Sequence, residues 1–289
     1  MILIAGATGH LGGLITRNLL DQRHEVRILV RSESPYHSLV QAGAQAAIGD
    51  LKEPSSLTPA CVGVNTVITT ANSALRGGDD TTETVDWLGN RNLIDASLRA
   101  GVKQFIFVSA VAAHVDSPVP LFQAKAKVEA YLRSSGLPYT ILAPCMFMEV
   151  WFPMVVGRPA LAGQPVALVG EGRQKNDFIS TSDVAAFAVA AVGHPDAVCK
   201  HLPLAGPLPL SWRDVIAGYE RLLGRTLNVE SLSPDSAMPG LPEPVGRMVG
   251  QMMTNLEKNE ALINMSDTPR VFGVKQKTLD DVLRQQVSS

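Results

Sequence analysis

Three glycines near the start of the chain have the spacing of a phosphate-binding turn. Gly6, Gly9 and Gly12 follow the apolar segment 2–5 and lead into a helical pattern over residues 14–21. Glycines so placed let the backbone turn sharply and bring amide N–H groups near a pyrophosphate, whose charge the helix N-terminus complements. The alternative is a tight connection that binds nothing. We expect the loop and the first helical turn to contact a dinucleotide through Gly6, Thr8, Gly9, His10, Leu11 and Gly12.

The residue that follows the second apolar segment indicates which dinucleotide is bound. A site for NAD usually places Asp or Glu there, where the carboxylate accepts hydrogen bonds from the ribose hydroxyls. This chain has Arg31 followed by Ser32, and a guanidinium makes charge-assisted, bidentate contacts with a 2′-phosphate. The sequence therefore predicts that NADP(H) is preferred over NAD(H). Two alternatives are that Arg31 is simply solvated and that nearby Glu33 accepts the ribose hydroxyls.

Three further strand-like segments also end in candidate contacts, because ligands of open α/β sheets bind at the carboxyl edge. Asp50 can accept a hydrogen bond from the adenine amino group while Leu51 covers the ring, or it can equally cap the next helix. The remaining expected cofactor contacts are Thr70, Ala71, Asn72 and Ser109.

Short β-rich segments alternate with amphipathic helical segments over the first half of the chain. Expected strands cover residues 2–5, 25–30, 45–48, 66–70, 104–108 and 139–142. Expected helices include 81–100 and 121–135, because Gly101 and Gly136 stand where a left-handed residue would end them. This alternation predicts an α/β fold with a Rossmann-type, doubly wound parallel sheet.

The alternation breaks up after residue 145, where proline and glycine become frequent. We expect an NADP-binding Rossmann domain over residues 1–155 and a smaller C-terminal substrate-binding part over 156–289. A helix over about 181–193, with hydroxyl groups at its start to cap it, is expected to return to the sheet. The methionine-rich segment 247–253 has a helical pattern and fits ordinary core better than the wall of a ligand pocket.

Charge and composition exclude several classes of protein. A net charge of −2 offers no broad positive field for nucleic acid. Three scattered cysteines suggest neither a disulfide framework nor a zinc site, and the six histidines lack metal-ligand spacing. The chain opens on a strand-like segment, and its longest apolar stretch is too short for a bilayer. We expect a cytoplasmic protein without a metal, a membrane or a nucleic-acid partner; its partner is a small-molecule substrate, and its oligomeric state stays open.

Taken together, these motifs give the chain a family resemblance. It resembles the NmrA-like branch of the atypical short-chain dehydrogenase/reductases, whose members include quinone reductases, isoflavone-type reductases and NADP-sensing regulators. The resemblance spans nearly the full length, and the combination of motifs is much more specific than the glycine motif alone. It rests on the following segments, in chain order: GATGHLGG, LVRS, GD at Asp50, AGVKQFIFVS, KAKVEAYLRSSGLPYTILAP, DFISTSDVA and GVKQKTLDDVL.

The resemblance implies a role for Lys125. Short-chain dehydrogenases typically use a Tyr-x-x-x-Lys pair, and a spacing of four places both side chains on one helix face. Here Leu121 occupies the tyrosine position and Lys125 is retained, so the usual proton donor is absent. The resemblance therefore implies that Lys125 holds the nicotinamide ribose and acts as a weak acid. From the residues alone, a solvated lysine paired with Glu129 is the alternative.

Other residues near the expected nicotinamide are candidates too. His114, in a loop at the carboxyl edge, could supply a proton, although a loop histidine is more often solvated. Pro144 and Phe147 are expected cofactor contacts. The apolar run 145–152 could form a hydrophobic wall at that edge. The same run could equally be a helix that packs its apolar face on the core.

The favoured hypothesis is an NADP(H)-dependent oxidoreductase that reduces a small conjugated acceptor such as a quinone, an enone or another aromatic-type molecule. Such an acceptor takes hydride without a strong tyrosine acid, so Lys125, His114 or water could give the proton. The alternative is a catalytically weak NADP(H)-sensing regulator that acts through a protein partner. A sugar-nucleotide epimerase is disfavoured, since transient oxidation of an alcohol would need the missing phenolic base.

Overall fold

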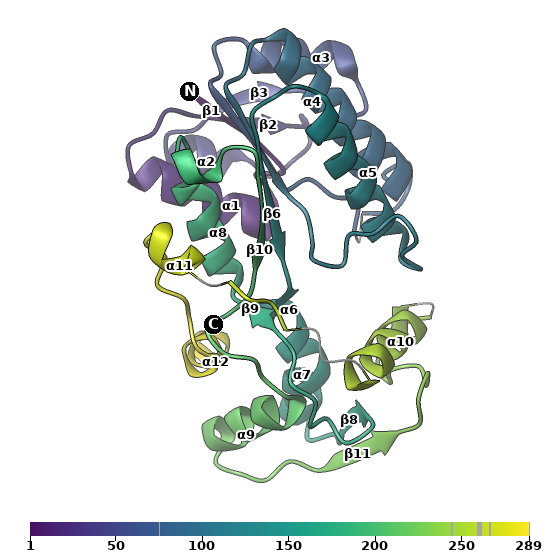
Figure 1. Cartoon of the computed structure of the whole chain (residues 1–289). Coiled ribbons are helices and arrows are strands. Elements are labelled where there is room, and N and C mark those ends of the chain that lie inside the picture. The colour runs from purple at the N-terminus through teal and green to yellow at the C-terminus, as the bar shows by residue number, and fades with distance from the viewer. Residues whose placement is uncertain (75, 244, 259–261, 266, 289) are drawn as a thin grey trace. The chain divides into compact units, whose positions relative to one another are not determined.

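The computed structural model describes residues 1–74, 76–243, 245–258, 262–265 and 267–288 (Figure 1). The chain forms two compact units. The first comprises Met1–Pro144, Ser182–Leu204 and Asp267–Val274, and the second comprises Cys145–Thr181, Ala205–Ser266 and Lys275–Ser289. Among the described helices, none is both long enough and apolar enough to cross a bilayer.

A seven-stranded sheet, parallel throughout, forms the centre of the first unit. Its strands follow the usual order of a doubly wound sheet, in which β1 lies inside the sheet and the chain moves outward to each side in turn. The strands, in spatial order, are β10 (Lys200–Leu204), β6 (Tyr139–Pro144), β5 (Gln104–Val108), β4 (Thr66–Thr69), β1 (Ile2–Ala5), β2 (Val26–Val30) and β3 (Gln45–Ile48). The predicted fold class is confirmed.

Helices cover both faces of this sheet, which explains why its central strands are continuous apolar runs. Every residue of β1, β4 and β5 is buried, as expected for strands with helices on either side. One face carries α3 (Pro54–Cys61), α4 (Asn90–Arg99) and α5 (Pro120–Ser134); the other carries α1 (His10–Asp21), α2 (His37–Gln41) and α8 (Thr181–Ala190) (Figure 1).

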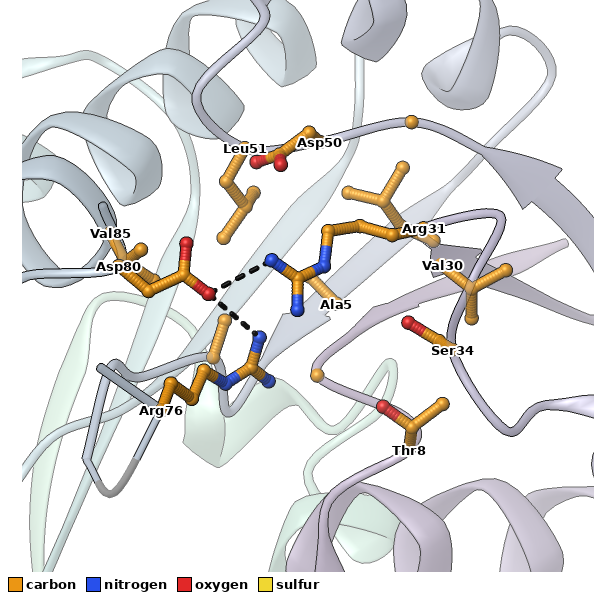
Figure 2. Close-up of a pocket in the computed structure, with 14 residues that line it drawn as sticks. Ala5, Thr8, Val30, Arg31, Ser34, Asp50, Leu51, Arg76, Asp80 and Val85 are labelled. Carbon is orange, nitrogen blue, oxygen red and sulfur yellow. Dashed lines mark hydrogen bonds and ion pairs between the residues drawn. The ribbon is translucent and has the colours of Figure 1, made fainter. Parts of the chain in front are cut away.

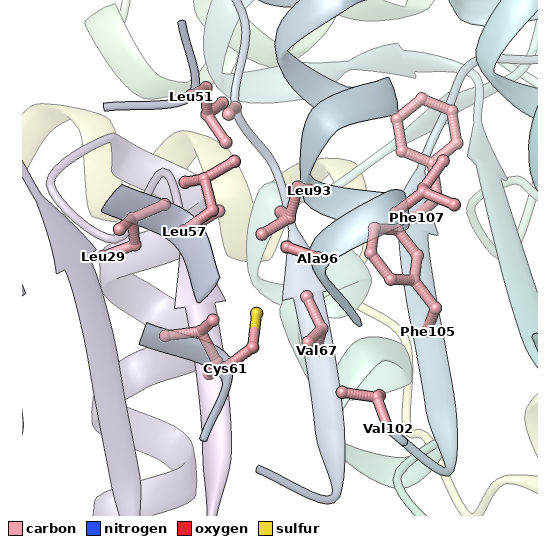
Figure 3. Close-up of a cluster of buried hydrophobic side chains, with 14 of the residues drawn as sticks. Leu29, Leu51, Leu57, Cys61, Val67, Leu93, Ala96, Val102, Phe105 and Phe107 are labelled. Atoms are coloured by element: carbon pink, nitrogen blue, oxygen red, sulfur yellow. The ribbon is translucent and has the colours of Figure 1, made fainter. Parts of the chain in front are cut away.

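An apolar core lies under the α3, α4 and α5 face (Figure 3). Leu57 and Leu93 of the helices and Val67 and Phe105 of the strands are fully buried there. These buried side chains hold each strand against the helices, and so they fix the position of the strand's carboxyl end. The core therefore positions the loops that the sequence singles out.

The expected helix over 81–100 is divided in two. Residues Thr82–Gly89 form a π-helix (η1), and α4 continues from Asn90. Glycine at position 89 lets the junction pack closely against Leu51, because a Cβ there would lie 2.9 Å from Cβ of Leu51. A stretch of π-helix inside an α-helix is rare and is often found beside functional sites.

The strand β10 is not among the strands expected from the sequence. Its residues, Lys200 to Leu204, include two basic residues and Pro203, a composition that favours a loop. The strand nevertheless pairs in parallel with β6 at the edge of the sheet. An edge position tolerates proline, because one side of the strand makes no ladder hydrogen bonds.

The second unit has its own apolar core. The aromatic rings of Phe152, Phe178 and Trp212 pack together at its centre, with ring centroids 5.0 to 6.5 Å apart. Its strands are β7 (Met146–Phe147) paired with β9 (Phe178–Ile179), and β8 (Val166–Val169) paired with β11 (Val229–Leu232). Its principal helices are α6 (Met148–Phe152), α7 (Arg158–Leu161), α9 (Trp212–Leu223), α10 (Val245–Lys258) and α12 (Leu279–Ser288).

Candidate nucleotide-binding site

The glycine turn between β1 and α1 has the geometry of a phosphate-binding loop. Gly6 has φ +86°, a backbone conformation that residues with a Cβ rarely adopt. A Cβ on Gly12 would lie only 2.2 Å from the carbonyl oxygen of Gly6, so glycine alone lets the helix approach the turn this closely. The N-cap residue of α1, Gly9, has no side chain to cap the helix. The first amides of α1 are therefore available to an anion.

A pocket opens beside this turn, at the carboxyl ends of β1, β2, β3 and β4 (Figure 2). This edge is where open parallel sheets bind their ligands. The pocket is lined by Ala5, Gly6, Thr8, Leu29, Val30, Arg31, Ser34, Gly49, Asp50, Leu51, Ala71, Arg76, Asp80 and Val85. Six of the residues predicted to contact a cofactor, namely Gly6, Thr8, Arg31, Asp50, Leu51 and Ala71, line it.

Three basic side chains converge on a buried carboxylate at one side of the pocket. Nη1 of Arg31 donates to Oδ2 of Asp80 at 2.9 Å, and Nζ of Lys52 donates to Oδ1 at 2.7 Å. Arg76 forms a longer ion pair with the same carboxylate at 3.7 Å, and Figure 2 shows both arginines directed at Asp80. On its other side, Nε of Arg31 lies 3.2 Å from exposed Glu33. Arg31 is thus held in the pocket wall rather than free in water.

The chain around Asp80 holds its carboxylate in place. Gly77 and Gly78 both have positive φ, and Gly77 pairs with Asp80 in an isolated β-bridge. Immediately afterwards, Thr81 caps η1, with its Oγ1 accepting from the Thr84 amide at 3.1 Å. The hydrogen bond from Lys52 and the charge of Arg31 hold the pKa of Asp80 below its ordinary value. Asp80 is therefore a fixed anion at neutral pH.

Asp50 and Leu51 line the pocket directly after β3. Oδ1 of Asp50 accepts from the backbone amide of Lys52 at 2.9 Å, so this carboxylate stabilises its own turn. It does not cap α3, whose N-cap residue is Glu53. Helix capping by Asp50 is therefore not observed, and its contact with an adenine stays a prediction. Leu51 lines the same pocket, where it could cover the ring (Figure 2).

The end of β4 supports the glycine turn. Oγ1 of Thr70 donates a hydrogen bond to the carbonyl oxygen of Gly6 at 3.4 Å. Asn72 is engaged in its own loop, since its Nδ2 donates to the Thr70 carbonyl at 3.3 Å and its Oδ1 accepts from the Ala74 amide at 3.0 Å. Direct contacts of Thr70 and Asn72 with a cofactor stay predictions, and their observed contacts shape the turn.

Lys125 lies at the carboxyl end of β5. Its Nζ donates to the carbonyl oxygen of Val108 at 2.8 Å and stands 5.2 Å from the centre of the Phe107 ring. Burial lowers the pKa of Lys125 to about 8, against the nearby charges of Asp86 and Glu129. The side chain is half-buried rather than solvated. Since an ammonium has three N–H donors, the bond to Val108 leaves others for a ligand.

Asp86, on η1, is a buried carboxylate near Lys125. Its Oδ2 accepts from the amide and the hydroxyl of Ser73 at 3.0 and 2.6 Å. Its Oδ1 is buried without a hydrogen-bond partner among the described residues. Burial raises the pKa of Asp86, although both hydrogen bonds from Ser73 oppose this. A carboxylate so placed keeps negative potential beside the Lys125 amine.

Ser109 and Glu129 form a contact that the sequence did not suggest. The Ser109 hydroxyl donates to Oε1 of Glu129 at 2.5 Å, and both residues are buried. Glu129 also accepts from Arg133 at 2.8 Å, and its Oε1 lies 3.5 Å from Nε2 of His201. Glu129 is therefore a buried anchor within the unit and not a surface partner of Lys125. A cofactor contact of Ser109 stays a prediction.

The remaining predicted site residues occupy different settings. His114 is exposed, and its Nδ1 accepts from the Asp116 amide at 3.2 Å, so a catalytic role for it stays a prediction. Pro144 is the buried last residue of β6. Phe147 belongs to the second unit, where it forms β7 with Met146. His10 and Leu11 begin helix α1 beside the open amides.

Comparison with known proteins agrees with these features. A family model described as the NmrA-like family matches residues 1–281. The chain belongs to the NmrA-like family. The predicted family resemblance is thereby confirmed over almost the whole length of this NmrA-like protein.

Individual relatives of this NmrA-like protein carry different names. "Photosystem II assembly factor Ycf39" of Synechocystis is 34% identical over 234 residues, covering 80% of this chain and 70% of the relative. "NAD(P)H azoreductase" of Xenophilus azovorans is 28% identical over 296 residues, covering 100% and 99%. A solved NADPH-dependent quinone oxidoreductase of Escherichia coli, complexed with NADPH, superposes with a TM-score of 0.82 at 23% identity, covering 99% and 100%. The last likeness establishes a shared fold.

Proposed function

We propose that this NmrA-like protein is an NADP(H)-dependent reductase that transfers hydride to a small conjugated acceptor such as a quinone or an aromatic dye. The observation that carries the proposal is the pocket at the carboxyl edge, where Gly6 and Thr8 of the glycine turn and Arg31 line one cavity, and where the turn leads directly into the uncapped first turn of α1. These groups suit a pyrophosphate and a phosphorylated ribose, because both ligands carry negative charge that amides and a guanidinium bind.

The residues present fit a dinucleotide. Because Gly12 has no Cβ, α1 packs closely against the turn, and the first amides of the helix can approach a pyrophosphate. Arg31 lies at the strand end where a 2′-phosphate is recognised in such folds, which supports NADP(H) over NAD(H). Asp50 and Leu51 stand at the next strand end, where an adenine would be held.

The chemistry at the other end of the cofactor would depend on Lys125. When bound, the reduced nicotinamide supplies a hydride. Lys125 can hold the ribose through N–H groups not used by the Val108 carbonyl and can release a proton to the reduced acceptor. With its pKa lowered to about 8 by burial, the ammonium is still protonated at neutral pH and gives up its proton more readily than an ordinary lysine.

The absence of a tyrosine acid favours one class of acceptor. Leu121 stands one helical turn before Lys125 on α5, where related enzymes carry the phenol. A quinone or azo compound spreads the incoming charge over a conjugated system and therefore needs less help from an acid. The names of relatives, an azoreductase and a quinone oxidoreductase, support acceptors of this kind.

The test is oxidation of NADPH by the purified protein with a panel of quinones, enones and azo dyes. We expect turnover with at least one of these classes, with NADPH used in preference to NADH, and no oxidation when the acceptor is omitted. The reduced nicotinamide absorbance gives the rate, and chromatography should show acceptor reduced in an amount equal to the NADPH consumed. Tight NADPH binding without turnover across the panel would contradict reductase activity.

A second candidate function is a nucleotide-dependent regulator that acts through a protein partner. The relative named as a photosystem II assembly factor, at 34% identity, and the leucine at position 121 favour this alternative. A sensor must distinguish oxidised from reduced cofactor. Equal affinity for NADP⁺ and NADPH would therefore argue against sensing, whatever the outcome with acceptors.

A further inference from the structure

We infer that Lys52 and Arg76 join Arg31 as ligands of the cofactor's 2′-phosphate, and that Asp80 occupies this phosphate subsite as an internal anion in the free protein. This inference rests on the proposed binding of NADP(H). It assigns the preference between the two dinucleotides to a cluster drawn from the loops after β2, β3 and β4. Of this cluster, the sequence predicts Arg31 alone.

The geometry of the cluster is that of an anion site. Asp80 presents two oxygens, and each is bound by a different basic group: Oδ2 by Arg31 at 2.9 Å and Oδ1 by Lys52 at 2.7 Å. A phosphate monoester also offers several oxygens to Arg and Lys donors, and such charge-assisted bonds are among the strongest in proteins. The side chain of Asp80 is only 7% exposed, so the three cations face an anion inside the pocket and not one in solvent.

The three basic groups have capacity left for a second anion. Arg31 uses Nη1 for Asp80 and Nε for Glu33, and a guanidinium carries five N–H donors in all. Arg76 lies 3.7 Å from Asp80, beyond hydrogen-bond distance, and its side chain is 36% exposed. Small rotations of Arg76 and Lys52 would transfer their donors from the carboxylate to a phosphate. Asp80 would then remain as a neighbour and weaken binding by repulsion.

An internal anion of this kind has a predictable effect on affinity. While Asp80 holds the donors, only part of the protein molecules are ready to bind phosphate, so the apparent affinity falls by that fraction. In return, the carboxylate keeps three cations together in the free protein, where they would otherwise repel one another. Removing its charge should therefore tighten phosphate binding and weaken the free fold. These two opposite effects separate this role from a merely structural one.

The opposite assignment for Asp80 is that it accepts hydrogen bonds from the ribose hydroxyls of NAD(H). In that case its carboxylate would discriminate against a 2′-phosphate and would contribute affinity for the unphosphorylated ribose. The two assignments predict opposite changes for the same substitution, Asp80→Asn. The positions of Lys52 and Arg76 favour the first, because a diol needs no further cations.

The experiment compares adenosine 2′,5′-bisphosphate with adenosine 5′-monophosphate, which differ only in the phosphate at issue. Calorimetry gives the dissociation constants, and thermal unfolding gives the stability of free and ligand-bound protein. We expect Lys52→Met and Arg76→Gln each to weaken the bisphosphate about tenfold, the loss of one charge-assisted hydrogen bond, and to leave the monophosphate unchanged. Arg99→Gln, at an exposed arginine in the last turn of α4, is the matched control and should change neither.

For Asp80→Asn we expect the bisphosphate to bind about fivefold more tightly and the free protein to have a lower melting temperature. Adding bisphosphate should raise the melting temperature of this variant by more than it raises that of the wild type. Wild-type affinity in both the Lys52 and Arg76 variants would overturn the inference and leave the proposed function intact. Weaker monophosphate binding by Asp80→Asn would overturn it in favour of the ribose assignment. If the wild type bound neither NADPH nor the bisphosphate, the proposed function would fail together with it.

Discussion

Replacing Lys125 with methionine is expected to lower kcat for NADPH-dependent reduction by about 100-fold or more, the usual contribution of a general acid. Methionine is an unbranched side chain of similar length, but it removes the amine that contacts the Val108 carbonyl and stands over the Phe107 ring. KM for NADPH should also rise, because the same amine is proposed to hold the ribose. Steady-state kinetics with the best acceptor of the panel measures both effects.

The pH dependence gives a second, independent readout for Lys125. Its amine can donate a proton only while it is an ammonium, so kcat of the wild type should fall as pH rises through about 8. The methionine variant should lack this fall. Lys127→Met is the matched control, since Lys127 lies two residues further on the same helix, half-exposed and 3.9 Å from Glu83. Activity of Lys125→Met within threefold of the wild type, with an unchanged pH profile, would exclude Lys125 as the acid.

Substituting Gly12 with alanine should abolish measurable dinucleotide binding, a loss of about 100-fold or more in affinity, because the proximity that glycine allows cannot be kept. The added methyl group would stand 2.2 Å from the Gly6 carbonyl, so either the turn or α1 must move. Calorimetric titration with NADPH measures the loss, and circular dichroism shows whether the fold survives.

Gly13→Ala is the matched control for this substitution. It places the same methyl group on the next residue of α1, where the closest atoms are the flexible end of Arg17 at 3.3 Å and the Ala7 carbonyl at 3.4 Å. Alanine also favours the helix more than glycine does. We expect the control to bind NADPH nearly as well as the wild type. Near-normal binding by Gly12→Ala would show that the glycine turn does not hold the dinucleotide.

The sheet was largely predictable because its strands carry local signals. Runs such as Ile2 to Ala5 and Gln104 to Val108 are buried on both faces and therefore apolar along most of their length, and glycines mark the turns between them. β10 was missed for the opposite reason. As an edge strand it carries Lys200 and His201 exposed and Pro203 near its end, so its place comes from pairing with distant β6 rather than from its own sequence.

The site was predictable where a backbone conformation requires a particular residue. Gly6 and Gly12 are needed by the turn itself, and Arg31 directly follows a clear strand. The glycines and the arginine could therefore be found from their spacing. Their contribution to cofactor binding stays a prediction that titration with the dinucleotides tests. The family assignment, drawn from seven short motifs, is confirmed by the match over residues 1–281.

The carboxylates of the site could not be found in this way. Asp80 lies 49 residues from Arg31 and Asp86 lies well before Lys125 in the chain, so only the fold brings these groups together. A signal did exist for Asp80, which follows the Gly77-Gly78 turn directly before a helix cap. Asp86 is buried within η1, where an acidic side chain needs a polar partner.

Calorimetric titration of the purified wild-type protein with NADPH and, separately, with NADH tests nucleotide binding most directly. We expect saturable heat at one molecule per chain for NADPH, with affinity at least about tenfold higher than for NADH, because basic groups meet the additional phosphate. Heat from neither dinucleotide would contradict the claim that the turn after β1 holds a pyrophosphate. Tighter binding of NADH would contradict the role given to Arg31.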